Sequence, residues 1–189
     1  MAGLFSLDGN ILLWIQEYLR NPVCTEVFRV ITHLGDRGQV WILLAGIFLC
    51  CKKTRKAGVM IVAALLFSML ITNIGLKHIF ARTRPYEVVE GLFPLIPKPE
   101  EYSFPSGHTA SSFAAAWAVW KNAPKKYGVA ALVLAGLIAF SRLYVGVHYP
   151  TDVLGGISAG MMAAYAAEAV VNAAGQGLKL ITDRAKSKN

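Results

Sequence analysis

Charged residues are scarce in this sequence, and their scarcity excludes an ordinary soluble protein. Only 16% of the 189 residues are charged, whereas 55% are hydrophobic, with a mean hydropathy of +0.47. A soluble domain carries charge on about a quarter of its residues. Several apolar runs approach the ~20 residues that a helix needs to cross a bilayer. The composition therefore predicts an integral membrane protein that forms a single domain.

Cysteine and acidic residues are also few. The three cysteines (Cys24, Cys50 and Cys51) are odd in number and lack metal-ligand spacing, which argues against a disulfide framework or a cysteine-bound metal. Acidic residues number 11 against 19 lysines and arginines, giving a net charge of +8. Such an excess can indicate nucleic acid or anionic lipid. Because the basic residues cluster at predicted helix ends and no nucleic-acid module is visible, we expect membrane lipids as surroundings, no nucleic acid and no obligate protein partner.

The hydrophobic pattern predicts an all-α fold, a polytopic transmembrane helical bundle with N-terminal interfacial helices. Residues 1–37 read as amphipathic helices at 6–20 and 23–34, residues 38–175 as the transmembrane core, and residues 176–189 as a basic cytoplasmic tail. The pattern gives five spans, or six if residues 4–19 also cross. The expected spans are 39–51, 57–76 (continuing as helix towards 81), 106–120, 127–147 and 150–174.

The distribution of basic residues predicts which side each loop faces. With five spans, three basic clusters fall on one side, which the positive-inside rule assigns to the cytoplasm. The clusters are Lys52, Lys53, Arg55 and Lys56; Lys121, Lys125 and Lys126; and Lys179, Arg184, Lys186 and Lys188. The proline-rich loop 82–103 and the turn at His148 then lie together on the opposite, extracytoplasmic face. The compact size fits a bacterial plasma-membrane protein.

Polar groups of several kinds are predicted to meet on that face. They are the cations Lys77, Arg84 and Arg142, the helix start at Ser106 and Gly107, and the group His108, His148 and Asp152. Lys77 and Arg84 are seven residues apart and would point the same way if the helix persists. Each cation alone could be an interfacial anchor, but ionisable side chains near spans are usually functional. Cations around a helix N-terminus suit a phosphoryl group.

Three motifs carry a family resemblance. Residues 77–85 fit K-x6-R-P, residues 105–108 fit P-S-G-H, and residues 141–152 fit S-R-x5-H-x3-D. In order and spacing the chain resembles the type-2 phosphatidic acid phosphatase superfamily, in its small bacterial membrane branch. The resemblance covers residues 77–152 and implies a metal-independent phosphatase without a cofactor.

The resemblance also implies a role for each matching residue. His148 would be the nucleophile that forms a phosphohistidine, oriented by Asp152, and His108 would protonate the leaving group. Binding of the phosphoryl oxygens would fall to Lys77, Arg84, Ser106, Gly107 and Arg142. Arg82 lies off the defined motif positions and is given a supporting role, and no metal ligand is expected.

The motifs predict recognition of a phosphate group but do not identify the lipid tail of the substrate. An outward-facing site favours undecaprenyl diphosphate, hydrolysed to undecaprenyl phosphate, with phosphatidylglycerophosphate and phosphatidic acid as alternatives; the 86–102 loop is a candidate for head-group selection. A lipid phosphotransferase would use the same phosphohistidine. Vanadate haloperoxidases share the constellation but are soluble, which the hydrophobicity here argues against. A non-catalytic structural protein or transporter would tolerate substitution of His148.

Overall fold

The computed structural model describes residues 2–186, and side-chain surroundings are described for residues 7–177 and 183. All regular secondary structure in this part of the chain is helical, and it contains no strand. The principal helices are α1 (Ala2–Trp14), α2 (Pro22–Leu34), α3 (Gln39–Cys50), α4 (Arg55–Met69), α5 (Lys77–Phe80), α6 (Pro85–Val88), α7 (Gly107–Asn122), α8 (Lys125–Tyr144) and α9 (Pro150–Lys186). A π-helical stretch, Ile15–Leu19, extends α1, and a second, Leu70–Leu76, joins α4 to α5. A short 3-10 turn, Asp36–Gly38, links α2 to α3.

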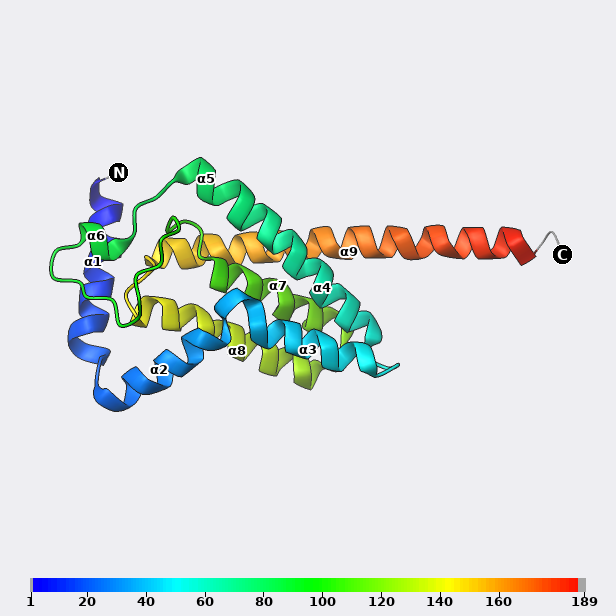
Figure 1. Cartoon of the computed structure of the whole chain (residues 1–189), viewed down its shortest axis with the longest axis horizontal. Coiled ribbons are helices and arrows are strands. Elements are labelled where there is room, and N and C mark those ends of the chain that lie inside the picture. The colour runs from blue at the N-terminus through cyan, green and yellow to red at the C-terminus, as the bar shows by residue number, and fades with distance from the viewer. Residues whose placement is uncertain (1, 187–189) are drawn as a thin grey trace.

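Helix α7 lies at the centre of the bundle and packs against α4, α8 and α9 (Figure 1). The buried face of α7 consists largely of alanine, and Trp41 from α3 reaches it to donate a hydrogen bond from Nε1 to Ser112 Oγ at 2.9 Å. Small side chains allow helices to approach closely where lipid provides no hydrophobic driving force between them. The alanines therefore set how near the polar ends of α7 and α9 come to each other.

Gly156 and Gly160 make the contact between α7 and α9 possible. A Cβ atom added at Gly160 would lie 2.4 Å from the carbonyl oxygen of Ala110, and one at Gly156 would lie 2.8 Å from that of Ser106. Any larger residue would push the two helices apart. The spacing of four residues places both glycines on one face of α9. This close approach brings the start of α7 beside the start of α9.

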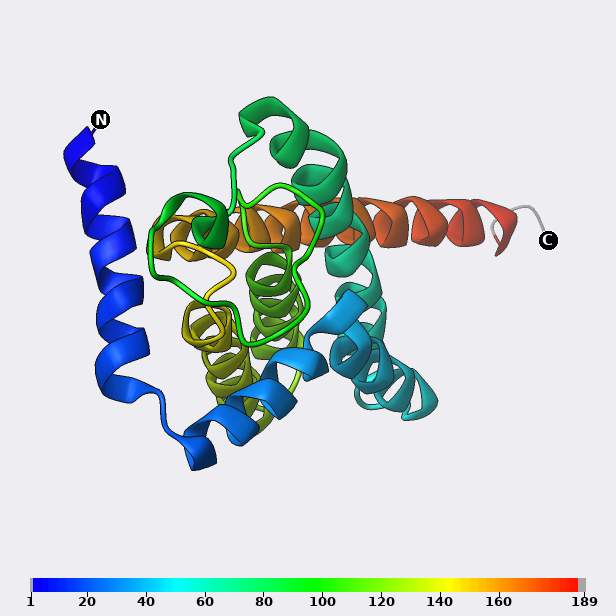
Figure 2. The same cartoon turned by 60° about the vertical axis from the view of Figure 1, so that its left-hand side comes forward.

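Helix α1 lies across the end of the bundle, and α2 runs from it back towards α3 (Figure 2). The turn between α3 and α4, the turn between α7 and α8, and the C-terminal end of α9 lie at the opposite end (Figure 1). The structure thus places the first two basic clusters and the far end of α9 together, away from the loop that contains residues 82–103. Lys188 of the third cluster is outside the described residues.

Three described helical segments are long and apolar enough to cross a membrane: Arg55–Val88, Lys125–Tyr144 and Pro150–Gly177. The count of five or six spans and the interfacial position of α1 and α2 stay predictions. The expected end of the last helix was wrong. The last helix does not end near residue 174 but runs to Lys186, beyond the body of the bundle (Figure 1).

The helix carrying Lys77 ends close to residue 81, as the sequence predicted, and so does not reach Arg84. It ends at Phe80, because Ala81 adopts a left-handed conformation with a φ of 42°, and Arg84 is extended with a φ of −75° and a ψ of 152°. A left-handed helix C-cap satisfies the last carbonyl groups but costs a non-glycine residue about 1 kcal/mol. Lys77 and Arg84 therefore reach the same region from different backbone directions and not from one helix face.

Candidate active site

Three cationic side chains are buried at the end of the bundle that holds the 82–103 loop. Lys77, Arg84 and Arg142 are 6%, 4% and 2% exposed. Arg84 donates to the backbone carbonyls of Glu101 at 2.7 Å and Val147 at 2.9 Å, and Arg142 donates from Nη1 to Thr32 Oγ1 at 2.5 Å. Buried charges are normally paired. Among the described side chains, however, no carboxylate lies within ion-pair distance of Arg84 or Arg142.

The Nε atom of Arg142 is buried and has no hydrogen-bond partner among the described residues. Such an atom loses its hydration without compensation, so native proteins rarely keep one that no ligand or water satisfies. The charge of Arg142 acts on both His108 and His148, so the guanidinium lies near both histidines. The unsatisfied donor therefore belongs to a cation that has no carboxylate partner among the described side chains.

His148 lies at the centre of this region, in the turn between α8 and α9. Its Nε2 atom is 3.3 Å from Arg84 Nη1, and its Nδ1 atom is 3.5 Å from Asp152 Oδ2. Burial lowers the pKa of His148, so the ring is neutral at pH 7. With the proton on Nδ1, facing the carboxylate, the lone pair on Nε2 faces the arginine. A neutral imidazole that is unprotonated at Nε2 can act as a nucleophile.

The start of α7 supplies hydrogen-bond donors to the same region. Ser106 is the fully buried N-cap of α7, and its backbone N–H donates to the carbonyl oxygen of Asp152 at 3.0 Å. A Cβ atom added at Gly107 would lie 3.8 Å from Lys77 Nζ, so the first helical N–H group and the lysine flank one space. A helix N-terminus beside cations is suited to binding an anion.

Two carboxylates that the sequence reasoning did not single out contact the predicted residues. Glu101 forms an ion pair with Lys77 Nζ, and this hydrogen bond holds the pKa of Glu101 below its usual value. Asp36 Oδ1 lies 2.8 Å from His108 Nε2, and its Oδ2 lies 2.8 Å from His33 Nδ1. The hydrogen bond with His108 is the main reason that the pKa of Asp36 falls to about 2. Asp36 is therefore ionised beside His108 at neutral pH.

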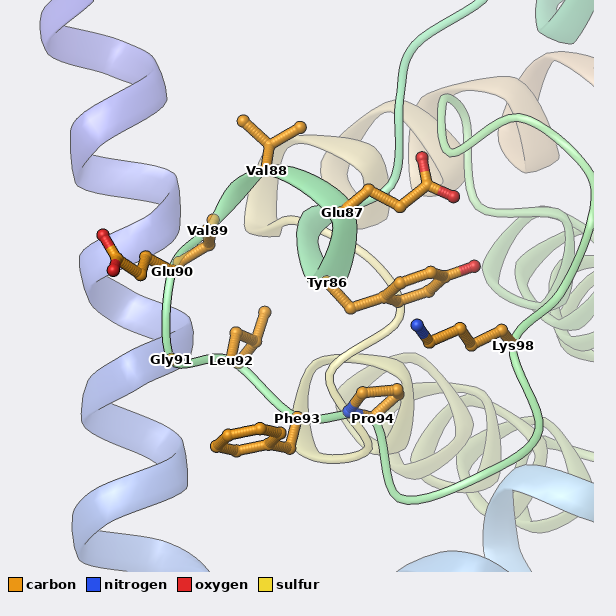
Figure 3. Close-up of a pocket in the computed structure, with 10 residues that line it drawn as sticks. All are labelled: Tyr86, Glu87, Val88, Val89, Glu90, Gly91, Leu92, Phe93, Pro94 and Lys98. Atoms are coloured by element: carbon orange, nitrogen blue, oxygen red, sulfur yellow. The ribbon is translucent and has the colours of Figure 1, made fainter.

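The 86–98 segment encloses a separate hollow of about 490 Å³ next to α1 (Figure 3). The Lys98 ammonium group lies 5.4 Å from the centre of the Tyr86 ring, whose hydroxyl donates to the carbonyl oxygen of Pro99 at 2.8 Å. The predicted involvement of this loop in head-group selection stays a prediction. Within the described residues, no three His, Cys, Asp or Glu side chains gather as a set that could hold a metal ion.

Comparison with known proteins gives the family. The family model described as the PAP2 superfamily matches residues 57–176, which is more than half of the chain. The chain belongs to the PAP2 superfamily. An undecaprenyl-diphosphatase of Sulfolobus acidocaldarius is 35% identical over 120 residues, which are 64% of this chain and 58% of that protein. The alignment thus spans little more than half the length of that relative.

Two further PAP2 relatives match over a larger share of the chain. Phosphatidylglycerophosphatase B of Bacillus subtilis is 33% identical over 159 residues, which are 76% of this chain and 73% of that protein. The crystal structure of a transmembrane PAP2-type phosphatidylglycerolphosphate phosphatase from Bacillus subtilis superimposes with a TM-score of 0.73 at 29% identity. It covers 91% of this chain and 88% of the other. The helical bundle is therefore the PAP2 fold over nearly its whole length.

The structure brings together all eight site residues that the sequence predicted, from α5, the residue before α6, the start of α7, α8, and the turn into α9. Their catalytic and binding roles stay predictions. The sequence reasoning gave Arg82 only a supporting part and missed Asp8, Asp36, Glu101 and Ser103, whose contacts with the predicted residues depend on tertiary packing. One signal was available for Asp36. Its Gly35-Asp36-Arg37-Gly38 segment separates two predicted helices, and the five-span topology puts this turn on the same face as the 82–103 loop.

Proposed function

We propose that this protein is a membrane lipid phosphatase that works through a phosphohistidine on His148. The observation that carries the proposal is the buried Arg142 Nε atom without a partner, beside Arg84 and near a neutral His148. A phosphoryl group supplies the anionic oxygens that these donors lack, and its charge grows on the equatorial oxygens in the transition state. Arg142, Arg84 and Lys77 bind those oxygens together with Ser106 and the Gly107 N–H group.

The chemistry proceeds in two balanced steps. His148 Nε2 attacks phosphorus, forming a P–N bond while the bond to the lipid oxygen breaks, and His108 gives a proton to that leaving oxygen. Water then attacks the phosphohistidine, transfers a proton to His108 and releases inorganic phosphate, which restores both histidines. Asp152 keeps the Nδ1 proton of His148 in place and so keeps Nε2 free to attack. None of these steps requires a metal ion or a cofactor.

The favoured substrate is undecaprenyl diphosphate, hydrolysed to undecaprenyl phosphate on the extracytoplasmic face of a bacterial plasma membrane. The similarity to the Sulfolobus undecaprenyl-diphosphatase supports this substrate. Phosphatidylglycerophosphate is the second candidate, because the Bacillus subtilis phosphatidylglycerophosphatase B relative and the matching crystal structure resemble this chain over most of their length. Transfer of the phosphoryl group to a lipid alcohol in place of water would use the same first step.

The proposal is tested by phosphate release from undecaprenyl diphosphate and phosphatidylglycerophosphate by detergent-purified protein in EDTA. His148→Ala should abolish release. His78→Ala is the matched control, because His78 follows Lys77 at a variable position of the first motif and is exposed, with the Ile74 carbonyl oxygen as the partner in its described hydrogen bond. Phosphate release that EDTA abolishes, or that survives His148→Ala, would refute the mechanism. A phosphorylated acceptor lipid in place of free phosphate would identify a transferase.

A further inference from the structure

Asp152 is held by groups other than the histidine it is predicted to orient. Its Oδ2 atom accepts hydrogen bonds from Ser103 Oγ at 2.5 Å and from the Tyr149 backbone N–H at 2.9 Å. Its Oδ1 atom lies 2.6 Å from Arg82 Nη1. By contrast, the buried His148 Nδ1 atom is 3.5 Å away and has no closer partner among the described residues. The position of the carboxylate is therefore set by groups other than the histidine, two of them on Oδ2, the oxygen nearer His148, and Arg82 on Oδ1.

Arg82 connects Asp152 to a second carboxylate. Its Nη2 atom is 2.8 Å from Asp8 Oδ2, and its guanidinium carbon lies over the Tyr149 ring, 4.0 Å from the ring centre. Nη1 also donates to Thr151 Oγ1 at 2.6 Å. A planar guanidinium fixed by carboxylates on two of its nitrogens has one orientation. Arg82 cannot move without moving Asp152.

Asp8 comes from α1, far from the motifs in sequence. Only 3% of Asp8 is exposed, and besides Arg82 it accepts hydrogen bonds from Thr151 Oγ1 at 2.5 Å and from the Thr151 backbone N–H at 3.3 Å. These contacts fix the first turn of α9, which carries Asp152. A carboxylate buried this deeply on an otherwise peripheral helix is costly unless its partners require it.

From this chain of contacts we infer that Asp8 and Arg82 are positioning residues for the nucleophile, so that α1 completes the active site although it lies outside the matched residues 57–176. Asp8 holds Arg82, Arg82 holds Asp152, and Asp152 sets the tautomer and direction of the His148 ring. The inference rests on the proposed function, because it assumes that His148 attacks phosphorus. It adds that the rate of attack depends on a residue of the N-terminal helix.

The variants Asp8→Asn and Arg82→Gln test the inference: the first keeps the side-chain size while removing the charge, and the second replaces the guanidinium with a shorter, neutral amide. Neither residue contacts the phosphate-binding side chains in the contacts above. We therefore expect kcat to fall about tenfold or more, as for outer residues that orient a functional histidine, while KM changes less than twofold. Gln16→Ala is the matched control. Gln16 anchors the same N-terminal segment to the carbonyl oxygen of Gly91 and the N–H of Phe93, and has no described contact with Arg82 or Asp152.

Nitrogen-15 NMR of histidine-labelled protein supplies a readout that a loss of folding would not imitate. The chain has four histidines, so the His148 signals are assigned by their absence in His148→Ala. In the native protein they should show one tautomer with Nδ1 protonated; in Asp8→Asn and Arg82→Gln they should report a mixture, with the other histidine signals unmoved. If one variant is unstable in detergent, the other carries the test.

The outcomes distinguish a failure of the proposed function from a failure of the inference about Asp8 and Arg82. If His148→Ala keeps activity, the proposed function fails. If His148→Ala is inactive while Asp8→Asn and Arg82→Gln match the native kcat and His148 spectrum, the inference alone is refuted. An equal loss in Gln16→Ala would also overturn it, because anchoring of α1 in general would then explain the effect. Loss of kcat confined to Asp8→Asn and Arg82→Gln, with altered His148 signals, supports it.

Discussion

Replacing Asp36 with asparagine should slow the departure of poor leaving groups and spare good ones. Asp36 contacts His108, the proposed general acid, through a hydrogen bond of 2.8 Å to Nε2. With Nε2 engaged, Nδ1 is left to protonate the leaving oxygen, and the carboxylate stabilises the positive ring before transfer. The asparagine keeps the size of the side chain but removes this charge. Activity that depends on a protonated His108 should therefore fall.

The structure limits the size of the effect. A hydrogen bond to a charged group contributes about 1.5–3 kcal/mol. The Asp36 side chain is 41% exposed, so solvent screening favours the lower end of that range. About 1.4 kcal/mol corresponds to a tenfold change in rate. General acid catalysis as a whole contributes about 10²- to 10⁴-fold, so Asp36→Asn should leave part of the advantage that His108→Ala removes entirely.

The assay compares two soluble phosphate monoesters at one pH. An alkyl phosphate needs its leaving oxygen protonated, whereas the nitrophenolate of p-nitrophenyl phosphate departs almost unaided. We expect Asp36→Asn to lower kcat about tenfold for the alkyl ester and less than twofold for p-nitrophenyl phosphate. Equal losses for both esters would show that Asp36 acts on binding or folding. A gain in activity would show that the carboxylate competes with substrate, and either result would refute the reasoning.

Three further variants test separate parts of the structure. Glu101→Gln removes the carboxylate paired with Lys77 and should tighten vanadate inhibition several-fold at neutral pH. The pKa of Glu101 is depressed, so the ion pair that competes with vanadate is present above that pKa and is lost as the pH falls through it. The difference in vanadate inhibition between the variant and the native protein should therefore shrink in acid. Arg142→Met removes an uncompensated buried charge, so thermal unfolding should show a stability gain of about 1 kcal/mol together with loss of phosphate release; a lower midpoint would contradict this account. Gly160→Ala places a methyl group 2.4 Å from the Ala110 carbonyl oxygen. It should destabilise the protein by about 1–3 kcal/mol and so lower the unfolding midpoint by several degrees. Gly136→Ala is the control and should leave the midpoint unchanged, because a Cβ added there meets no neighbouring atom within 4 Å.

The sequence was sufficient to predict most helices, because apolar runs and proline or glycine breaks are local signals. The start of the last helix at Pro150 and the end of the second at Leu34 were read directly from such signals. The sequence placed the end of the helix carrying Lys77 near residue 81 but did not reveal that Ala81 turns left-handed, since alanine is a strong helix former. Tertiary contacts decide that turn, because Arg82 is fixed by Asp8 and Asp152 immediately beyond it.

The residues that the sequence missed share a physical reason. The sequence does draw attention to Lys77, Arg84, Arg142 and the two motif histidines, because an ionisable group among apolar residues is costly and usually functional. Asp8, Asp36 and Glu101 lie in segments where a carboxylate is unremarkable, on an amphipathic helix, in a turn and in a polar loop. The role of each carboxylate depends on which cation or histidine it faces, and tertiary packing decides that.

The distribution of the four carboxylates around the site is consistent with the proposed division of work. Arg84 and Arg142, the arginines proposed to bind phosphate, have no described carboxylate partner, whereas each residue proposed to keep one orientation or one proton has one. Asp152 holds His148, Asp36 holds His108, and Asp8 holds Arg82. A carboxylate beside Arg84 or Arg142 would neutralise the charge that attracts phosphate, so the uncompensated charge is confined to the place where substrate can satisfy it. Glu101 is the exception, because it pairs with Lys77 from an exposed loop position and can be displaced by the arriving phosphate at the cost of one partly solvated ion pair.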